Sequence, residues 1–368
     1  MRRLAWNLGF VALLLTIALA AAGSRAAERV VHVYNWSDYI AADTLERFRA
    51  VTGIRAVYDV FDSNEVLETK LVAGNSGYDV VFPSLKPYGE RMIRAAMLKP
   101  LDRARLPNLD NIDPAMLRVM AEADPGNRYL APYMWGTTGI GYNTAKVRAA
   151  LGAAAPATSW RLLFDPAAAA KLAACGIGIL DDDEALAAML VYLGRDPNSA
   201  APADLDAAAA AYAKVRPHVR YFHSSKYIEA LANGDLCVAL GFSGDVVQAR
   251  NRAREANNGI DIAYAIPAEG ASLWVDTMAI PKNAPHPAEA HAFIDFLMRP
   301  EIIAAISNKV AYANANAAAT PLVAADVRGD PGIYPPDAVR ARLFTLKLLA
   351  ESERRRRTRA WTRITTGQ

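Results

Sequence analysis

The chain has 368 residues, of which 53% are hydrophobic and 21% are charged. This length allows two domains with substantial cores, and the balance of apolar and charged residues is typical of a soluble globular protein. The formal net charge is only +3, so the composition favours neither nucleic acid nor an anionic membrane surface as a partner.

The first 26 residues are predicted to be a signal peptide. Arg2 and Arg3 form a charged start, Phe10 to Ala22 is apolar, and Ser24–Ala26 offers small residues for cleavage after Ala26. An uncleaved anchor helix is the alternative, but the apolar run is short for a full membrane span. No later stretch approaches the roughly 18 uninterrupted apolar residues that a span requires. The mature protein is therefore expected to be exported and soluble.

Export with loss of the signal peptide would change the net charge of the chain and place its cysteines in an oxidising compartment. Cleavage removes Arg2, Arg3 and Arg25, which leaves 38 basic against 38 acidic residues and a net charge of zero. The chain has two cysteines, Cys175 and Cys237. An even pair in an oxidising compartment suggests one disulfide, and two reduced buried thiols are the alternative.

The first third of the mature chain alternates strand and helix signals. In chain order we expect a strand at 29–33, a helix at 41–51, a strand at 54–60, a helix at 63–72, a strand at 78–82 and a helix at 88–96. The second of these helices has Asp62 or Ser63 as its N-terminal cap. Such alternation predicts an α/β fold with a parallel sheet.

The rest of the chain is predicted to form a second lobe and then to return to the first. Residues 129–142 are aromatic and glycine-rich with almost no charge, which indicates a strand pair or a crossover. Residues 260–266 and 277–280 resemble the returning strands. We therefore expect two discontinuous lobes joined by a hinge. The first would comprise residues 27–134 and 256–308, and the second residues 135–255 and 309–368.

A Trp-Ser-Asp-Tyr run follows the first predicted strand, at Trp36, Ser37, Asp38 and Tyr39. In open α/β sheets ligands bind at the carboxyl ends of the strands. A carboxylate there can hold an ammonium by a charge-assisted hydrogen bond, and aromatic faces attract the cation and cover its methylenes. The run therefore suits a cation on an apolar chain. The alternative is that Trp36 and Tyr39 are core residues and that Asp38 caps a helix.

The same combination of acidic, aromatic and hydroxyl residues recurs near other predicted strand ends. These positions are Ser84, Asp181 to Glu184, Phe242, Asp245, Trp274, Asp276 and Tyr312. Each has a structural alternative: the acidic run can cap a helix, and Phe242 and Trp274 can be core. Their recurrence in a two-lobed exported protein favours a common binding cleft.

Longer strings then bring out a resemblance that covers essentially the whole mature chain. They are Tyr34–Tyr39, Tyr58–Glu65, Pro132–Trp135, Arg220–Ser225, Leu231–Asp235, Tyr312–Asn316 and Pro331–Pro336. In these strings the sequence resembles the periplasmic polyamine-binding proteins, in particular the putrescine-binding component of a bacterial ABC importer. The resemblance implies a two-lobed type II periplasmic solute-binding fold with a hinge between the lobes, and a disulfide between Cys175 and Cys237.

The resemblance also implies a ligand-binding set. It comprises Trp36, Ser37, Asp38, Tyr39, Ser84, Glu184, Phe242, Asp245, Trp274, Asp276 and Tyr312. Asp245 and Asp276 would hold one ammonium, and Asp38 and Glu184 the other. Phe242 and Trp274 exchange the aromatic types usual in the putrescine pattern, and the acidic run before Glu184 is one residue shorter. The choice among putrescine, spermidine and agmatine therefore stays open.

The expected function is the capture of a polyamine in the periplasm and its delivery to ABC permease subunits in the inner membrane. We expect a monomer with no cofactor, no metal and no nucleic-acid partner. Alternatives are a carboxylate-based hydrolase and a binding protein for another small cationic solute. No nucleophile–histidine arrangement supports the enzyme, and the five histidines show no metal-ligand spacing. Lys86 near Ser84 is unexpected beside a cation site.

Overall fold

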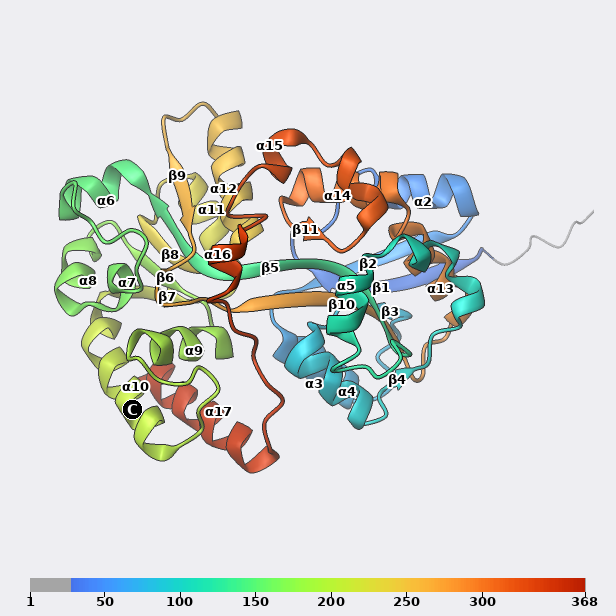
Figure 1. Cartoon of the computed structure of the whole chain (residues 1–368), viewed down its shortest axis with the longest axis horizontal. Coiled ribbons are helices and arrows are strands. Elements are labelled where there is room, and N and C mark those ends of the chain that lie inside the picture. Colours follow the sequence, from blue (N-terminus) through green and yellow to red (C-terminus); the bar gives the residue numbers. More distant parts are fainter. Residues whose placement is uncertain (1–27, 368) are drawn as a thin grey trace, which may run out of the picture.

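A computed structural model describes residues 28–367 of the chain. The predicted signal peptide and its cleavage site lie outside the described residues. One mixed sheet runs through the whole molecule in the strand order β2-β1-β3-β10-β5-β8-β6-β7, and helices cover it in two groups, one at each end (Figure 1). Within the described residues, no helix combines the length and the apolar character needed to cross a bilayer.

The first group surrounds the strands predicted from the N-terminal third. Strand β1 (Val30–Trp36) runs parallel to β2 (Arg55–Phe61) and β3 (Val80–Val81). The intervening helices are α2 (Thr44–Thr52) and α3 (Asn64–Val72), and the Ser63 hydroxyl caps α3 by accepting from the Val66 amide. The predicted βαβ alternation is confirmed.

Two long strands carry the chain between the groups. Strand β5 (Leu130–Asn143) is one continuous crossover rather than a strand pair. Its first half pairs with β10 (Leu273–Pro281), and its second half pairs with β8 (Val238–Phe242) and β9 (Ile262–Ala265). Gly139 makes this crowding possible, because a Cβ there would stand 2.5 Å from the Ala265 carbonyl oxygen.

The second group has its own parallel strands, β6 (Ile177–Ile179) between β7 (Val219–Phe222) and β8. The remaining strands are β4 (Leu98–Lys99) and β11 (Ala313–Asn314). The remaining helices are α4 (Glu90–Arg94), α5 (Pro114–Met120), α6 (Thr144–Leu151), α7 (Arg161–Phe164), α8 (Pro166–Leu172), α9 (Asp183–Tyr192), α10 (Pro202–Val215), α11 (Tyr227–Ala232), α12 (Ser243–Glu255), α13 (Pro287–Leu297), α14 (Pro300–Val310), α15 (Ala325–Arg328), α16 (Asp337–Arg340) and α17 (Glu351–Thr366). Short helical turns lie at Leu85–Gly89, Arg103–Arg105, Pro107–Asn111, Arg216–His218 and Ala317–Leu322.

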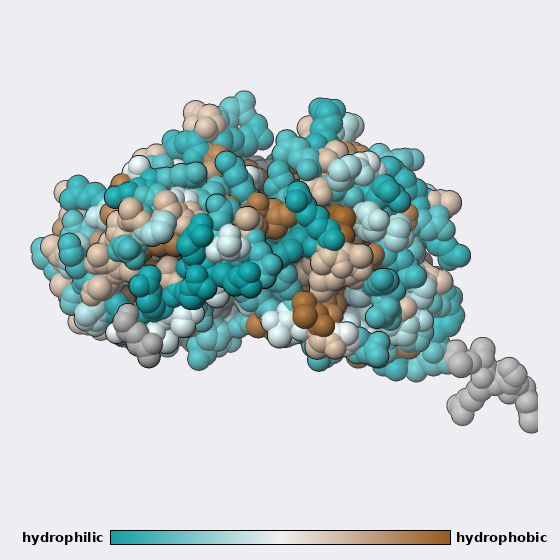
Figure 2. Space-filling model, turned by 90° about the horizontal axis from the view of Figure 1, so that it is seen from below, coloured by the Kyte–Doolittle hydropathy of each residue, from teal (hydrophilic) through white to brown (hydrophobic). Residues whose placement is uncertain are grey.

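Two separate hydrophobic cores correspond to the two lobes. One contains buried side chains of residues 31–134 and 275–333, with Val247, and the other contains those of residues 140–271, with Ala360 and Ile364. The predicted boundaries at 256 and 309 do not coincide with these cores. Strand β9 pairs with the second half of β5, and residues 310–333 pack into the first core. We propose that the returning crossover is β10 alone, and that a third crossing follows residue 333. Seen from below, the two lobes meet across a waist (Figure 2).

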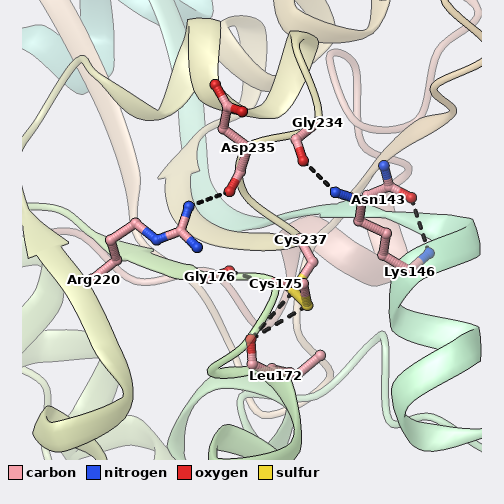
Figure 3. Close-up of a disulfide and its surroundings, with 9 residues drawn as sticks. All are labelled: Asn143, Lys146, Leu172, Cys175, Gly176, Arg220, Gly234, Asp235 and Cys237. Carbon is pink, nitrogen blue, oxygen red and sulfur yellow. Dashed lines mark hydrogen bonds between the residues drawn. A yellow bond between two sulfur atoms is a disulfide. The ribbon is translucent and has the colours of Figure 1, made fainter.

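The predicted disulfide is present between Cys175 and Cys237, whose Cα atoms are 5.4 Å apart (Figure 3). Cys175 lies just before β6 and Cys237 just before β8, so the bond joins the amino ends of two neighbouring parallel strands. The predicted ligand residues Glu184 and Asp245 follow the carboxyl ends of the same two strands. The disulfide therefore lies at the edge of the second lobe's sheet opposite to these residues.

Candidate binding cleft

A cleft of about 760 Å³ lies between the lobes and opens to solvent. Its walls contain ten of the eleven predicted ligand residues, which are Trp36, Ser37, Tyr39, Ser84, Glu184, Phe242, Asp245, Trp274, Asp276 and Tyr312. Most of them lie at or just after the ends of strands in both lobes, whereas Trp274 and Asp276 lie within β10. The sequence positions that the resemblance brought together thus face one cavity.

Asp245 and Asp276 form one acidic end of this cleft. Asp276 accepts hydrogen bonds from the Tyr39 hydroxyl at 2.9 Å and the Ser84 hydroxyl at 2.6 Å. Asp245 accepts from the hydroxyls of Tyr227 and Tyr312, both at 2.7 Å. All four donors that the described residues supply are neutral. They orient the carboxylates without neutralising their charge.

Local structure explains why these two carboxylates face the cleft. The pairing of β10 with β5 shifts its register between Asp276 and Thr277, and such an irregularity changes the direction of the side chains beside it. Asp245 lies in the first turn of α12, which begins directly after β8. A helix N-terminus favours a negative charge there.

Both carboxylates have raised pKa values. Burial raises the pKa of Asp276 to about 7 and that of Asp245 to about 6, while their hydroxyl partners act in the opposite direction. The negative charge of Asp245 also contributes to the raised pKa of Asp276. Burial therefore disfavours the charged forms of both acids, and a bound cation would stabilise them.

A second acidic end is built around Glu184. Its Oε1 accepts from the Ser272 hydroxyl at 3.0 Å, whereas its Oε2 is buried and has no hydrogen-bond partner among the described residues. Burial raises the pKa of Glu184 to about 7. A buried carboxylate oxygen without a donor is costly unless a ligand supplies one.

Further acids surround Glu184. Asp182 caps α9 by accepting from the Glu184 amide at 3.0 Å, and Glu65 accepts from the Tyr88 hydroxyl. Burial, followed by the charges of Glu184, Glu65 and Asp183, raises the pKa of Asp182 well above its usual range. Arg357 pairs with Asp183 at 2.9 Å. This end therefore concentrates negative charge, and within residues 28–367 Asp183 alone among these four acids has an ion-pair partner.

Aromatic rings line the space between the two ends. Trp274 packs edge to face against Phe242 and Tyr312, with ring centroids 5.7 and 5.4 Å apart, and Trp36 packs against Phe61 at 4.6 Å. The indole N–H of Trp274 donates to the Thr138 hydroxyl at 3.2 Å. Such walls suit methylene groups and the ammonium groups at their ends.

Two glycines permit these walls. A Cβ at Gly136 would stand 2.8 Å from the Trp274 ring, and one at Gly244 would stand 2.5 Å from the Tyr312 ring.

Tyr39 is both a core residue and a residue of the cleft, since it is 3% exposed and its hydroxyl donates to Asp276.

Asp38 is the one predicted ligand residue outside the lining. Its carboxylate pairs with the Arg252 guanidinium of α12 at 2.6 Å, and its backbone adopts a left-handed conformation with φ of 55°. That conformation turns the chain after β1. Asp38 therefore joins one lobe to a helix of the other, instead of facing the cavity.

Lys86 lines the cleft, but its ammonium is paired elsewhere. The Nζ atom lies 2.8 Å from the Glu122 carboxylate, so its positive charge is matched on the side of the first lobe. The unexpected lysine is thus compatible with a cation site.

Sequence reasoning did not assign several lining residues to the site. They are Phe61, Asp62, Asn64, Glu65, Tyr88, Ser224, Ser225, Ile228 and Leu346. The first four lie at or just after the carboxyl end of β2, so the rule that located Trp36 could have located them too. Leu346 lies in the segment between α16 and α17, and no pattern in the sequence indicates its position.

The chain was compared with known families and proteins. Residues 43–333 match the family model of the bacterial extracellular solute-binding protein. The chain is 51% identical over 365 residues to the putrescine-binding periplasmic protein PotF of Escherichia coli, covering 99% of this chain and 98% of that protein. It is also 51% identical over 363 residues to the putrescine-binding periplasmic protein SpuD of Pseudomonas aeruginosa, covering 98% and 99%.

Solved structures agree with these relatives. A putative spermidine/putrescine ABC transporter protein from Listeria monocytogenes superposes with a TM-score of 0.82 at 31% identity, covering 92% of this chain and all of that one. The two-lobed type II periplasmic binding fold expected from the sequence is confirmed. The chain belongs to the bacterial extracellular solute-binding proteins, within their group of periplasmic polyamine-binding proteins.

Proposed function

We propose that the protein binds a polyamine, putrescine or spermidine, in the cleft between its lobes and delivers it to an ABC permease. The observation that carries this proposal is the pairing of two buried acidic ends, Asp245 with Asp276 and Glu184 with its neighbours, across aromatic walls. A diamine presents two ammonium groups joined by methylenes, which is the complementary arrangement.

Eight of the eleven predicted ligand residues have a role in this proposal, and the role of Asp38 changes. One ammonium would be held by Asp245 and Asp276, and the other by Glu184, whose free Oε2 can accept a hydrogen bond. Trp36, Phe242, Trp274 and Tyr312 would cover the methylenes. Asp38 would act on closure of the lobes, because it pairs with Arg252.

Relatives support the rest of the functional prediction. They are named as periplasmic binding proteins for putrescine or for spermidine and putrescine. We propose accordingly that this protein acts in the periplasm as a non-enzymatic carrier, as a monomer that closes by a hinge over its ligand. The hydrolase alternative does not fit these relatives, and neither does a carrier for an unrelated cation.

Calorimetric titration of the mature protein with putrescine, cadaverine, spermidine, spermine and agmatine tests the proposal. A micromolar dissociation constant corresponds to about 8 kcal/mol, and two ion-paired ammonium groups with a preorganised aromatic box can provide it. Ornithine, which adds a carboxylate to the putrescine skeleton, is the matched control, since the acidic ends would repel that group. No heat of binding with any of the five amines would contradict the proposal.

A further inference from the structure

A second cavity, of about 500 Å³, lies directly behind the acidic end at Glu184. It shares Glu65, Tyr88 and Asp183 with the binding cleft, so these three side chains form the partition between the two spaces. Its other walls come from α3 and α4 of the first lobe and from α17 and the segment that leads to it, which lie near one another at the lower side of Figure 1.

The charge of the lining changes sign at this partition. The binding cleft is lined by seven carboxylates and one lysine, Lys86, which is paired with Glu122. The second cavity is lined by three carboxylates, two of them in the partition, and by four cations, Arg91, Lys347, Arg354 and Arg357. A cationic chain that fills the cleft therefore meets positive charge if it extends past Tyr88.

Ion pairs leave a positive excess in the second cavity. Arg91 is matched by Glu68, with Nη2 and Oε2 2.7 Å apart, and the buried Arg357 is matched by Asp183 at 2.9 Å. Glu65 faces the Tyr88 hydroxyl. The cations of Lys347 and Arg354 remain, and neither has an ion-pair partner among residues 28–367.

The backbone around Lys347 is fixed to the second lobe. Its amide donates to the Asn198 Oδ1 at 2.8 Å, and the Asn198 amide group donates to the Thr345 carbonyl oxygen at 3.1 Å. Arg354 is in the first turns of α17, one turn before Arg357, which is 2% exposed and also donates to the carbonyl oxygens of Pro197 and Ser199. The backbone that carries both residues is therefore held beside the partition, and their side chains are exposed to solvent.

We propose that Lys347 and Arg354 set an upper limit on the ligand, because they repel any ammonium that passes the partition at Tyr88. On this proposal, which rests on the polyamine function proposed above, the site accepts two or three ammonium groups and discriminates against a linear tetraamine. The two residues determine specificity by repulsion rather than by contact with the preferred ligand.

The test measures spermine and putrescine by competition in one buffer of low ionic strength, with the parent protein and with a Lys347→Gln/Arg354→Gln double variant. We expect the affinity for spermine to rise about fivefold, since exposed charges interact weakly through solvent, and the affinity for putrescine to stay within about twofold. The gain should shrink in 1 M salt, where the screening length is about 3 Å.

A matched control separates a local repulsion from a change in overall charge. The Arg355→Gln/Arg359→Gln variant removes two charges from the same helix, but neither residue lines either cavity. An unchanged ratio of spermine to putrescine affinity in the first variant, or an equal gain in the control, overturns the proposed limit. A parent protein that binds putrescine in that case leaves the polyamine function standing, whereas a parent that binds no polyamine overturns both.

Discussion

The two ends of the cleft hold the same chemical group in different surroundings. Asp245 and Asp276 receive four hydroxyl hydrogen bonds, so every carboxylate oxygen there has a donor before a ligand arrives. Glu184 receives one side-chain hydroxyl at Oε1 and none at Oε2, and further acids lie beside it. The first end is preorganised. At the second end, Glu184 Oε2 has no donor among residues 28–367, and Arg357 pairs with Asp183 rather than with Glu184.

This difference separates affinity from choice of ligand. A preorganised pair of carboxylates holds one ammonium in one position. Charge attraction then contributes most to the binding free energy, because no free energy is spent on arranging the side chains. The second end can accept an ammonium at Glu184 or further groups near Asp182 and Glu65. We therefore expect the first end to set how tightly any polyamine binds, and the second end to set which polyamine is preferred.

The largest expected effect comes from removing a charge at the first end. Asp245→Asn and Asp276→Asn should each weaken the free energy of putrescine binding by about 3–5 kcal/mol, because a desolvated ammonium loses its counter-charge. Trp36→Leu should cost nearer 1–2 kcal/mol, the value of a cation–π face. Calorimetry on the three variants gives the order.

The same aspartate variants carry an internal control for folding. Burial raises the pKa of both acids, so the amide should not lower the thermal unfolding temperature of the empty protein.

If Trp36→Leu weakened putrescine binding more than both aspartate variants, charge would not dominate at this end and the comparison would fail.

A smaller effect is expected at the second end. Glu184→Gln should weaken putrescine binding by about 1.5–3 kcal/mol, the range for a hydrogen bond to a charged group. Spermidine should bind at least comparably with putrescine in the parent protein, because Asp182 and Glu65 can receive a third ammonium and Lys86 is paired with Glu122. Competition between the two amines in one buffer measures this. A hundredfold preference of the parent for putrescine would contradict an adaptable second end.

The pH dependence of binding should reflect the acids at both ends of the cleft. A cation favours the ionised acids, whose pKa values are raised to about 7 for Asp276 and Glu184 and to about 6 for Asp245. Affinity should therefore be full above about pH 8 and fall as the pH drops through 7 and 6, roughly tenfold per unit for each group that must lose a proton. Titration of putrescine between these pH values, with Glu184→Gln as the comparison, assigns the change to one end.

The stability of the empty protein should respond in the opposite direction. An acid whose pKa is higher in the folded than in the unfolded state stabilises the fold at low pH, and that stabilisation is lost as the pH rises through the folded pKa. The unfolding temperature of the empty protein should therefore decline between about pH 4 and 7, and saturating putrescine should reduce the decline. A rise of the unfolding temperature with pH over this range, both with and without putrescine, would contradict the raised pKa values of these acids.

Local sequence patterns indicated the α/β fold, and the family resemblance indicated most of the residues that line the cleft. Strand ends place Trp36 and Asp245 at the cleft from opposite lobes, and Ser63 caps α3 as the helix signal indicates. The patterns could not show the register shift that re-aims Asp276, because it depends on pairing between strands far apart in the chain. Nor could they give the lobe boundaries, since β9 and residues 310–333 are assigned by packing alone.

Asp38 shows most clearly why the rest was out of reach. Its place beside Trp36 and Tyr39 matches the ligand run of the family, yet its direction depends on a left-handed turn and on an arginine more than two hundred residues later in the chain. Nothing in the local sequence distinguishes a carboxylate that faces a ligand from one that faces the other lobe.

The smallest expected effect therefore belongs to Asp38. Its side chain is 42% exposed and that of Arg252 is 35% exposed, so their ion pair is screened by solvent and should contribute about 0–1 kcal/mol. Because the pair joins the lobes, Asp38→Asn should weaken the free energy of putrescine binding by at most about 1 kcal/mol, which is less than the effect of Glu184→Gln. Arg252→Gln should have the same small effect, since either change removes the same contact.

Small-angle scattering with saturating putrescine should show the same reduced radius of gyration in the parent and in both variants, because the acids inside the cleft hold the lobes together through the ligand. The contradicting result is that Asp38→Asn loses as much binding as Asp276→Asn while Arg252→Gln binds normally. That result would place the Asp38 carboxylate against the ligand and make it part of the cation site.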